Sequence, residues 1–339
     1  MAYPLVTPGG TPDIYPSGSA NPITAYSGTF IPTIWSGKML EKFYASTVLA
    51  AIANTDWSGE IKSQGDKVIV RTKPTITINA YEVNQDLVVE RPGSDIIELD
   101  IDKGFYFNTA LDDVMETQAD LNMLGMWADD ASEQMKIKID TEVLAYAFTE
   151  VAAGTNEGGF AGAISGNGTD AGVDLGADGA AGGVAGTNSL VLVPRAPAAG
   201  QVEVIDAICR LGQVLDEQNI LETGRWLIVP AWMASMIKRS ELRDASLTND
   251  SMTMLRNGRL GMIERFTLYM SNLLPVDVTH GYTNIMAGHS HGLTFASQLT
   301  EMETMRSERS FSNIMRGLQV YGRKVVDGKS IALLRASAA

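Results

Sequence analysis

The chain has 339 residues, of which 45% are hydrophobic, and carries a formal net charge of −14. This composition supports a large core in one elaborate domain or two intimately joined ones. The acidic balance and the scattered Lys and Arg residues argue against a surface that grips nucleic acid. No apolar run reaches membrane-spanning length and the start lacks a signal-peptide layout, so we expect no membrane and synthesis in the cytoplasm.

Residues 1–56 are expected to form an arm and a short helix. Prolines among Gly, Ser and Thr preclude a helix in the first 34 residues and disfavour a central strand: Pro4, Pro8, Pro12, Pro16, Pro22 and Pro32. Because such an arm has no core of its own, we expect it to be disordered or to lie on a neighbouring subunit. Apolar spacings of three and four then predict a helix over residues 36–54.

Residues 57–107 are predicted to form a long hairpin and the start of a sheet. A period of two at residues 67–71 and 75–79 indicates extended strands. The return leg alternates Ile97, Leu99 and Ile101 with acidic residues, as a strand with one buried face does. Two strands alone are marginal in water, so we expect this finger, turning between residues 80 and 91, to lie against another subunit.

Residues 108–153 are predicted to form the spine segment. The longest helix of the chain is expected within it, over residues 112–153. Thr109 followed by Asp112 suggests a capping box, and Asp112 and Asp113 suit the positive end of the helix dipole. A helix of this length would span roughly 60 Å and act as a spine. Its apolar stripe comprises Leu121, Leu124, Ala128, Ala131, Met135, Ile139, Val143 and Tyr146.

Residues 154–188 are rich in Gly and Ala, with Asp, Thr and Asn among the rest. Such a composition buries too little apolar surface to offset its backbone entropy. We therefore expect a surface loop or insertion at the joint between two subdomains.

Residues 189–282 are predicted to form an α/β unit. It contains a buried strand at 226–229, a short helix at 231–239, a turn at Asn257-Gly258 and a strand at 263–270. The only cysteine, Cys209, cannot form an internal disulfide and is expected to be a small buried side chain. It falls in a first helix that carries Val204, Ile208, Leu211 and Leu215.

Residues 283–339 are mostly strand-like. Strands are predicted at 285–287, 293–295, 320–321 and 331–334, with a helical turn or two near 310–316. We expect these strands to return to pair with the finger and spine region, which makes the first subdomain discontinuous in sequence.

Two segments carry a resemblance to a known family: Arg225-Trp226-Leu227-Ile228-Val229-Pro230-Ala231-Trp232, with the following Leu242-Arg243-Asp244-Ala245, and Leu318-Gln319-Val320-Tyr321-Gly322-Arg323-Lys324-Val325. With the order of parts over roughly residues 30–339, they resemble the major capsid protein of tailed bacteriophages. The resemblance implies the α+β Hong Kong 97-type capsid fold. That fold has an N-arm, an E-loop hairpin, a long spine helix, a P-domain sheet and an inserted α/β A-domain.

The resemblance implies a structural protein and not an enzyme. Such a protein self-assembles into hexamers and pentamers of an icosahedral head that encloses double-stranded DNA without sequence-specific binding. The implied partners are copies of itself, a portal protein, a decoration or cement protein and a separate scaffolding protein, since no long scaffolding region opens this chain. No cofactor is expected. The implied location is the virion capsid, assembled in the host cytoplasm.

Charged residues of the finger and the last strands are candidate intersubunit contacts: Lys67, Lys73, Arg91, Arg306, Glu308 and Arg309. A solvated strand face explains Arg306, Glu308 and Arg309 at least equally well. Some relatives crosslink a Lys of the E-loop to an Asn of a neighbouring P-domain. Lys67 and Lys73 flank this finger, but no residue pattern marks the Asn, so we do not predict crosslinks.

Four short motifs suggest other chemistry. Gly288-His289-Ser290-His291-Gly292 matches the nucleophile-elbow pattern, but a strand follows it and no later histidine completes a triad. His280, His289 and His291 are the only histidines, and a polar turn explains them more simply than a metal site. Acidic residues of the glycine-rich segment have spacings that fit no calcium motif: Asp170, Asp174 and Asp178.

The fourth motif, Gly328-Lys329-Ser330, resembles the end of a P-loop. The position of its first glycine is Arg323, and too few residues follow to build a phosphate-binding helix. Three alternatives to a phage coat protein stay open: an encapsulin-like nanocompartment shell, a serine hydrolase using Ser290, and a secreted surface-layer or fibre protein. The last is disfavoured because no signal peptide is seen.

Overall fold

The computed structural model describes residues 44–56, 67–71, 74, 76–83, 85–87, 89–93, 96–118, 123–152, 155–162, 172–180, 188–240, 261–308 and 310–339. The chain divides into two units, Met1–Lys42 and Phe43–Ala339. The expected arm, the first part of the expected helix 36–54 and the Asn257-Gly258 turn lie outside the described residues. No helix in the described ranges is long and apolar enough to span a membrane.

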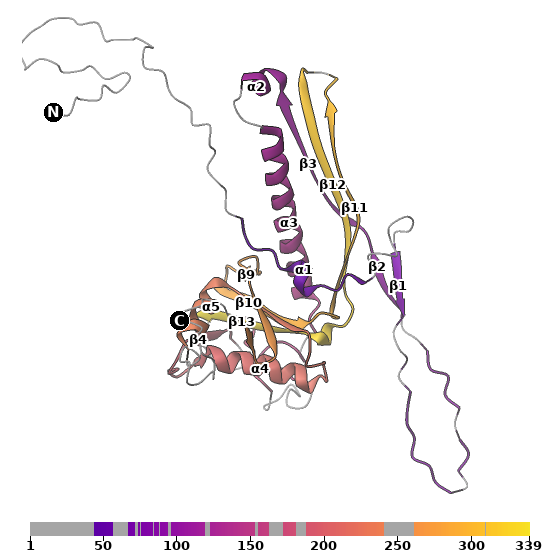
Figure 1. Ribbon diagram of the computed structural model, residues 1–339. Coiled ribbons are helices and arrows are strands. Elements are labelled where there is room, and N and C mark those ends of the chain that lie inside the picture. The colour runs from indigo at the N-terminus through magenta and orange to yellow at the C-terminus, as the bar shows by residue number, and fades with distance from the viewer. Residues whose placement is uncertain are drawn as a thin grey trace, which may run out of the picture. The chain divides into compact units, whose positions relative to one another are not determined.

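The second unit contains an eight-stranded sheet, which lies near the lower end of α3 in Figure 1. Its order is β5-β4-β13-β10-β6-β8-β7, and β9 pairs with β10. The pairs β10–β13 and β10–β6 are antiparallel, whereas β4 and β8 join parallel to β13 and β6. The strands are β4 (Leu190–Val193), β5 (Gln201–Glu203), β6 (Arg225–Val229), β7 (Met262–Ile263), β8 (Phe266–Met270), β9 (Val276–Asp277), β10 (Tyr282–His289) and β13 (Ile331–Ala338).

The two faces of this sheet are covered by different helices. Leu227 and Val229 of β6 share a core with helices α4 (Val204–Glu217) and α5 (Ala231–Arg239). The alternate residue of the same strand, Ile228, packs into a second core with helix α3 (Met123–Thr149). Because side chains alternate across a strand, a sheet covered on both faces has continuously apolar strands. All eight residues of β10 are accordingly buried.

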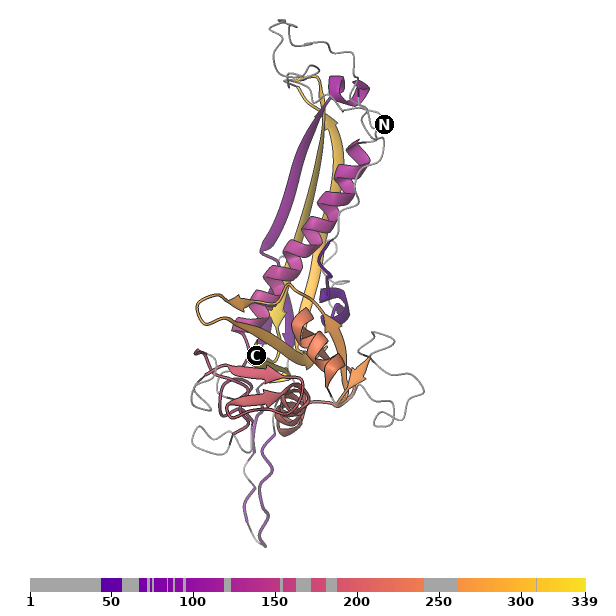
Figure 2. The same cartoon turned by 90° about the vertical axis from the view of Figure 1, so that its left-hand side faces the viewer.

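A second sheet has three long antiparallel strands in the order β11-β12-β3. They are β3 (Lys103–Asp112), β11 (Leu293–Arg306) and β12 (Ser312–Val325). Helix α3 contacts β3 and β12, and both views show it alongside this sheet (Figures 1 and 2). The short helix α2 (Asp113–Gln118) follows β3 directly, and a 3-10 turn, η3 (Gly328–Ser330), precedes β13.

The finger begins as a short ladder of β1 (Lys67–Arg71) with β2 (Ile96–Asp100). Leu99 is buried and Ile97 half-buried, as the alternation predicts. Beyond Arg71 no described residue of 76–93 belongs to a strand. The strand expected at 75–79 is therefore absent in its described residues, 76–79, although a hydrogen bond from the Thr77 amide to Glu90 (3.1 Å) joins the two legs.

Several expected helices differ from the structure. In the described residues the expected helix 112–153 is represented by α2 and α3, and Thr109 lies in β3 and not at a helix cap. At about 1.5 Å per residue, α3 spans roughly 40 Å and not 60 Å. Residues 312–316, where a helical turn was expected, form the start of β12 because they pair with β3.

The helix expected over residues 36–54 is helical only at α1 (Leu49–Ile52) within the described residues. The Asp140 carboxylate of α3 accepts hydrogen bonds from the Val48 and Leu49 amides, at 2.6 and 3.3 Å. Burial raises the pKa of Asp140. A side chain distant in sequence thus satisfies the start of α1.

The last strands differ from expectation in their partners. Strands β11 and β12 join β3 as expected, but β10 and β13 pair with each other and with the α/β unit. Sequence alternation identifies strands but not their neighbours, so a partner far along the chain escaped prediction.

The glycine-rich segment is not wholly a surface loop. Ala161, Val173 and Leu175 belong to the core under α4. Asn156 is fully buried and its side-chain amide donates to the Ile331 carbonyl at 3.0 Å. Cys209, by contrast, is exposed, because the buried face of α4 carries its neighbours Ala207 and Ile208.

Candidate intersubunit surfaces

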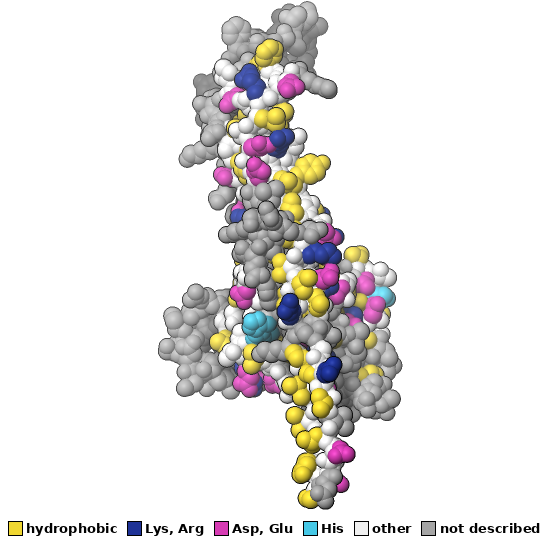
Figure 3. All heavy atoms as spheres, turned by 90° about the vertical axis from the view of Figure 1, so that its right-hand side faces the viewer, with side chains coloured by type: hydrophobic (Ala, Val, Ile, Leu, Met, Phe, Trp, Pro, Cys, Tyr) yellow, Lys and Arg dark blue, Asp and Glu magenta, His cyan; other side chains and the backbone are white. Residues whose placement is uncertain are grey.

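The finger is the most exposed apolar part of the described chain. Every described residue between 76 and 93 is exposed. Figure 3 shows hydrophobic side chains gathered along it at the bottom of the view. The large apolar side chains are Ile76, Ile78, Tyr81, Val83, Leu87 and Val89, which are 62 to 89% exposed. Full burial of each aliphatic side chain would contribute about 1.5–3 kcal/mol, so this surface favours a partner strongly.

A second surface is a groove on the three-stranded sheet. It has a volume of about 420 Å³ and is lined by Tyr106, Phe107, Asn108, Glu301, Glu303, Arg316, Gly317 and Leu318. Gly317 and Phe107 are register partners, and a Cβ at Gly317 would lie 2.3 Å from the Phe107 ring. The missing side chain gives the Phe107 ring room to lie against β12, on the face opposite to Tyr106 and Leu318. Arg316 pairs with Glu303 at the rim.

The far end of this sheet is apolar as well. Val114 and Met115 of α2, Met305 of β11 and Phe311 at the β11–β12 turn are exposed, Phe311 by 81%. Exposed apolar patches on folded chains mark interaction sites. Three separate regions of one subunit thus present apolar side chains to solvent.

Two of the six charged candidates, Lys67 and Arg306, form ion pairs within the subunit. Lys67, at the base of the finger, pairs with Glu98 (2.9 Å) and Asp100 (3.1 Å) across the β1–β2 ladder. The hydrogen bond to Glu98 and that to Asp100 raise the pKa of Lys67. Arg306 pairs with Asp113, which joins the end of β11 to α2. These two bases therefore have partners within their own subunit.

The remaining charged candidates are less constrained. Arg91 and Glu308 are exposed, on the finger and at the β11–β12 turn. Lys73 and Arg309 lie outside the described residues. No contact joins the four candidates that the structure describes, Lys67, Arg91, Arg306 and Glu308. Sequence reasoning named charges and missed the apolar residues of the finger, although its run of Ile, Tyr, Val and Leu in a hairpin without an apparent core was the available signal.

Ser290 lacks the surroundings of a nucleophile. It lies in the turn between β10 and β11, whereas a nucleophile elbow joins a strand to a helix. His289 Nε2 donates to the Thr223 carbonyl at 2.8 Å, and its Nδ1 accepts from the His291 amide at 3.2 Å. Both ring nitrogens are engaged, so His289 has no free nitrogen to activate Ser290. Burial lowers its pKa and favours this neutral form.

The segment Gly328-Lys329-Ser330 is a 3-10 turn and not a phosphate loop. The Lys329 amide donates a hydrogen bond to the Asp327 carboxylate at 2.9 Å. This amide is therefore not available to bind a phosphate. Strand β13 follows the turn immediately.

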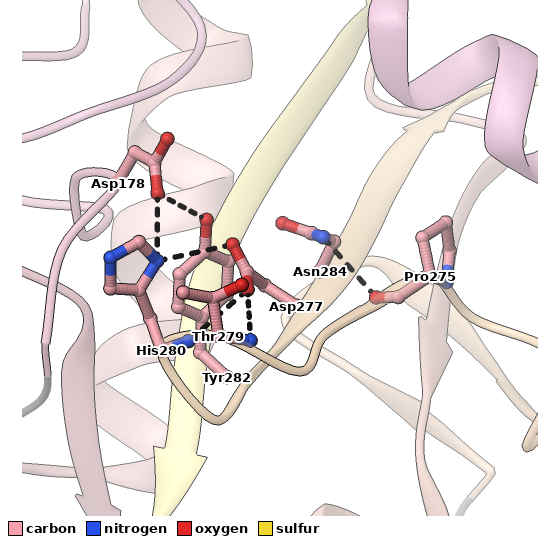
Figure 4. A network of polar contacts seen from close by, with 7 residues as sticks. All are labelled: Asp178, Pro275, Asp277, Thr279, His280, Tyr282 and Asn284. Atoms are coloured by element: carbon pink, nitrogen blue, oxygen red, sulfur yellow. Dashed lines mark hydrogen bonds and ion pairs between the residues drawn. The ribbon is translucent and has the colours of Figure 1, made fainter.

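One polar cluster does combine side chains suited to chemistry (Figure 4). His280 Nδ1 lies 3.2 Å from Asp277 Oδ2 and 3.5 Å from Asp178 Oδ1. The hydrogen bond with His280 lowers the pKa of Asp277 to about 2. The Tyr282 hydroxyl donates to Asp178 Oδ1 at 2.8 Å. Sequence reasoning weighed Asp178 and His280 in separate motifs and missed Asp277, because only the fold brings the three together.

An α+β fold with an eight-stranded sheet, a three-stranded sheet flanked by a long helix, and an extended apolar finger is that of the class of Hong Kong 97-type capsid subunits. A family model described as phage capsid protein matches residues 98–334. The chain belongs to this phage capsid protein family.

Solved capsid structures share the fold. The chain is similar to a solved structure of Mycobacterium phage Che8, with 21% sequence identity and a TM-score of 0.69. The match covers 90% of this chain and 97% of the Che8 chain. It resembles the capsid of cyanophage P-SCSP1u at 13% identity with a TM-score of 0.65, covering 92% and 94%. The capsid of a native GTA particle matches at 16% identity with a TM-score of 0.58, covering 94% and 99%.

None of the curated proteins matches this chain. The expectation of a tailed-phage major capsid protein, a structural protein of the virion's icosahedral capsid with the Hong Kong 97-type fold, is confirmed by the family and the shared fold.

Proposed function

We propose that this subunit assembles with its own copies into hexamers and pentamers that close an icosahedral head around double-stranded DNA. The observation that carries the proposal is the finger, whose apolar side chains have no core within the subunit. Obligate assembly interfaces bury roughly 2,000–5,000 Å² and are more apolar than transient ones. A finger, a groove and an apolar sheet end on one chain suit repeated contacts between identical copies.

In this assembly the finger of one copy lies on the three-stranded sheet of a neighbour. The groove presents Tyr106 and Leu318 beside the ion pair of Arg316 and Glu303, so an apolar contact there would be bordered by charge, as at an interface centre. Arg91 and Glu308, with Lys73 and Arg309, supply charged contacts around these surfaces. Lys67 and Arg306 position the finger base and the sheet end through their own ion pairs.

The enclosed DNA is held by confinement and not by a basic lining, since the net charge of the chain is −14. The proposed partners are a portal protein, a separate scaffolding protein and a decoration protein, and assembly takes place in the host cytoplasm. The subunit performs no catalytic step in this proposal.

The test is to express the full chain alone and with a scaffolding candidate encoded beside it, and to image the products by negative-stain electron microscopy. Shells, tubes or sheets built of six- and five-fold rings are expected. A monodisperse monomer under every condition would overturn the proposal. Shells that form without a portal and enclose a co-expressed enzyme would favour a nanocompartment of the encapsulin type instead.

A further inference from the structure

The cluster at the β9–β10 turn has the make-up of a metal-binding site. Asp178 Oδ1, Asp277 Oδ2 and His280 Nδ1 each offer one ligand atom, and these atoms lie within 4.8 Å of one another. With bonds of about 2.0 Å, tetrahedral zinc places its ligand atoms about 3.3 Å apart. The nitrogen lies 3.2 and 3.5 Å from the two carboxylate oxygens, which matches that spacing.

The ligand atoms are held by their surroundings. The Thr279 and His280 amides donate to Asp277 Oδ1 at 2.7 and 3.1 Å, which leaves Oδ2 directed at the imidazole. Strand pairing of Asp277 with Tyr282 fixes the turn, and Gly281, at φ +74, allows its tight return. Outer contacts of this kind orient metal ligands and tune their affinity.

Asp178 is fixed from another part of the chain. The backbone before it is anchored, since the Leu175 amide donates to Gly158 at 3.0 Å and the Ala177 amide to Asn188 at 3.0 Å. The Tyr282 hydroxyl holds the carboxylate of Asp178. Figure 4 shows the carboxylates of Asp178 and Asp277 both directed at the same nitrogen of the His280 ring.

The proton on His280 Nδ1 can be exchanged for a metal ion. Both groups facing this nitrogen are carboxylate oxygens, which only accept hydrogen bonds, so Nδ1 carries the proton in the metal-free protein. We propose that Asp178, Asp277 and His280 bind one divalent transition-metal ion of the zinc type, which replaces this proton and releases it. The remaining ligand positions are filled by water.

The chemistry of the ligands selects the ion. Imidazole nitrogen suits Zn²⁺, Co²⁺ and Ni²⁺, whereas Ca²⁺ and Mg²⁺ take oxygen ligands. The bound ion ties the segment 172–180 to the β9–β10 turn and stabilises the folded subunit. This role is independent of the proposed assembly.

The test uses the full chain without a histidine tag and Co²⁺ as the probe, because cobalt in such sites absorbs visible light. One Co²⁺ per chain is expected. Affinity falls at least about 100-fold in Asp277→Asn and His280→Gln and roughly 10-fold in Tyr282→Phe, which removes only an outer hydroxyl. The control is His291→Gln, which removes an exposed histidine elsewhere and leaves binding unchanged.

Thermal unfolding provides a second readout. Zn²⁺ in about 100-fold excess over its dissociation constant raises the unfolding midpoint of the wild type by about 5 °C and leaves that of His280→Gln unchanged. The proposal is overturned if the wild type shows no saturable Co²⁺ binding. It is also overturned if His280→Gln still binds Co²⁺, or if His291→Gln no longer does. It is overturned equally if Mg²⁺ or Ca²⁺ shifts the midpoint as much as Zn²⁺, since screening of two carboxylates would then explain the effect.

Discussion

The eight-stranded sheet and the finger represent opposite ways of placing apolar residues. In the sheet, β10 is buried along its whole length between two helix-covered cores. In the finger, every described residue from 76 to 93 is exposed, including Ile78 at 89% and Val89 at 86%. The sheet is stabilised within one subunit, whereas the finger has apolar side chains that its own subunit does not bury. Under the proposed function, folding and assembly therefore depend on different residues.

The largest expected effect on folding comes from the sheet. Phe266→Ala removes a fully buried ring and leaves a cavity, which lowers the free energy of unfolding by about 3–5 kcal/mol. Urea unfolding of unassembled subunits measures this loss. Tyr106→Ala is the matched control, because Tyr106 is 79% exposed and its truncation changes stability by no more than about 0.5 kcal/mol. Equal losses in both variants would contradict the contrast.

A smaller, pH-dependent effect is expected at Asp140. Burial raises its pKa in the folded state, so folded Asp140 binds a proton more tightly than unfolded Asp140 does. Between the unfolded and the raised folded pKa the folded chain holds more protons, and stability falls as pH rises. Asp140→Asn removes this titration and keeps an oxygen that accepts the Val48 and Leu49 amides.

The difference in unfolding free energy, variant minus wild type, therefore increases with pH through this window and is level above the raised pKa. Urea titrations at several values from about pH 4 to pH 7 measure this difference. A difference that is constant over the range would show that Asp140 does not titrate as described.

The smallest effect on folding is expected at the finger base. Lys67→Met removes two exposed ion pairs, with Glu98 and Asp100. Exposed pairs of this kind contribute little, because solvent screens them and the side chains lose entropy. Thermal unfolding of the variant should match that of the wild type within experimental error. A decrease of several degrees would mean that the ladder itself depends on Lys67.

The sequence predicted what local patterns determine. Helix α5 has the bounds expected from its pattern, and β1, β6 and α4 lie where apolar periodicity predicted them. Strand partners were harder to predict, because the apolar sequences of β10 and β13 do not indicate which sheet they join. The start of β12 was mistaken for a helical turn, since only pairing with β3 makes it extended.

The sites show the same limit. The finger could be predicted as a hairpin, and its need for a neighbour follows from two strands without a core. The cluster of Asp178, Asp277 and His280 could not be predicted, because Asp178 comes from a segment that only the folded chain brings to Asp277 and His280. Leu175 was likewise hidden within a glycine-rich segment whose composition favours a loop.

The central claim is that the finger is completed by other copies of the chain. The direct measurement is sedimentation velocity, with electron microscopy of the products, on a variant with Ile78, Val83, Leu87 and Val89 all changed to Ser. Its unfolding free energy should stay within about 0.5 kcal/mol of the wild type while particles fail to form. Asn79→Ser with Asp86→Ser, polar changes in the same finger, should assemble normally. Normal particles from the fourfold variant would contradict the account.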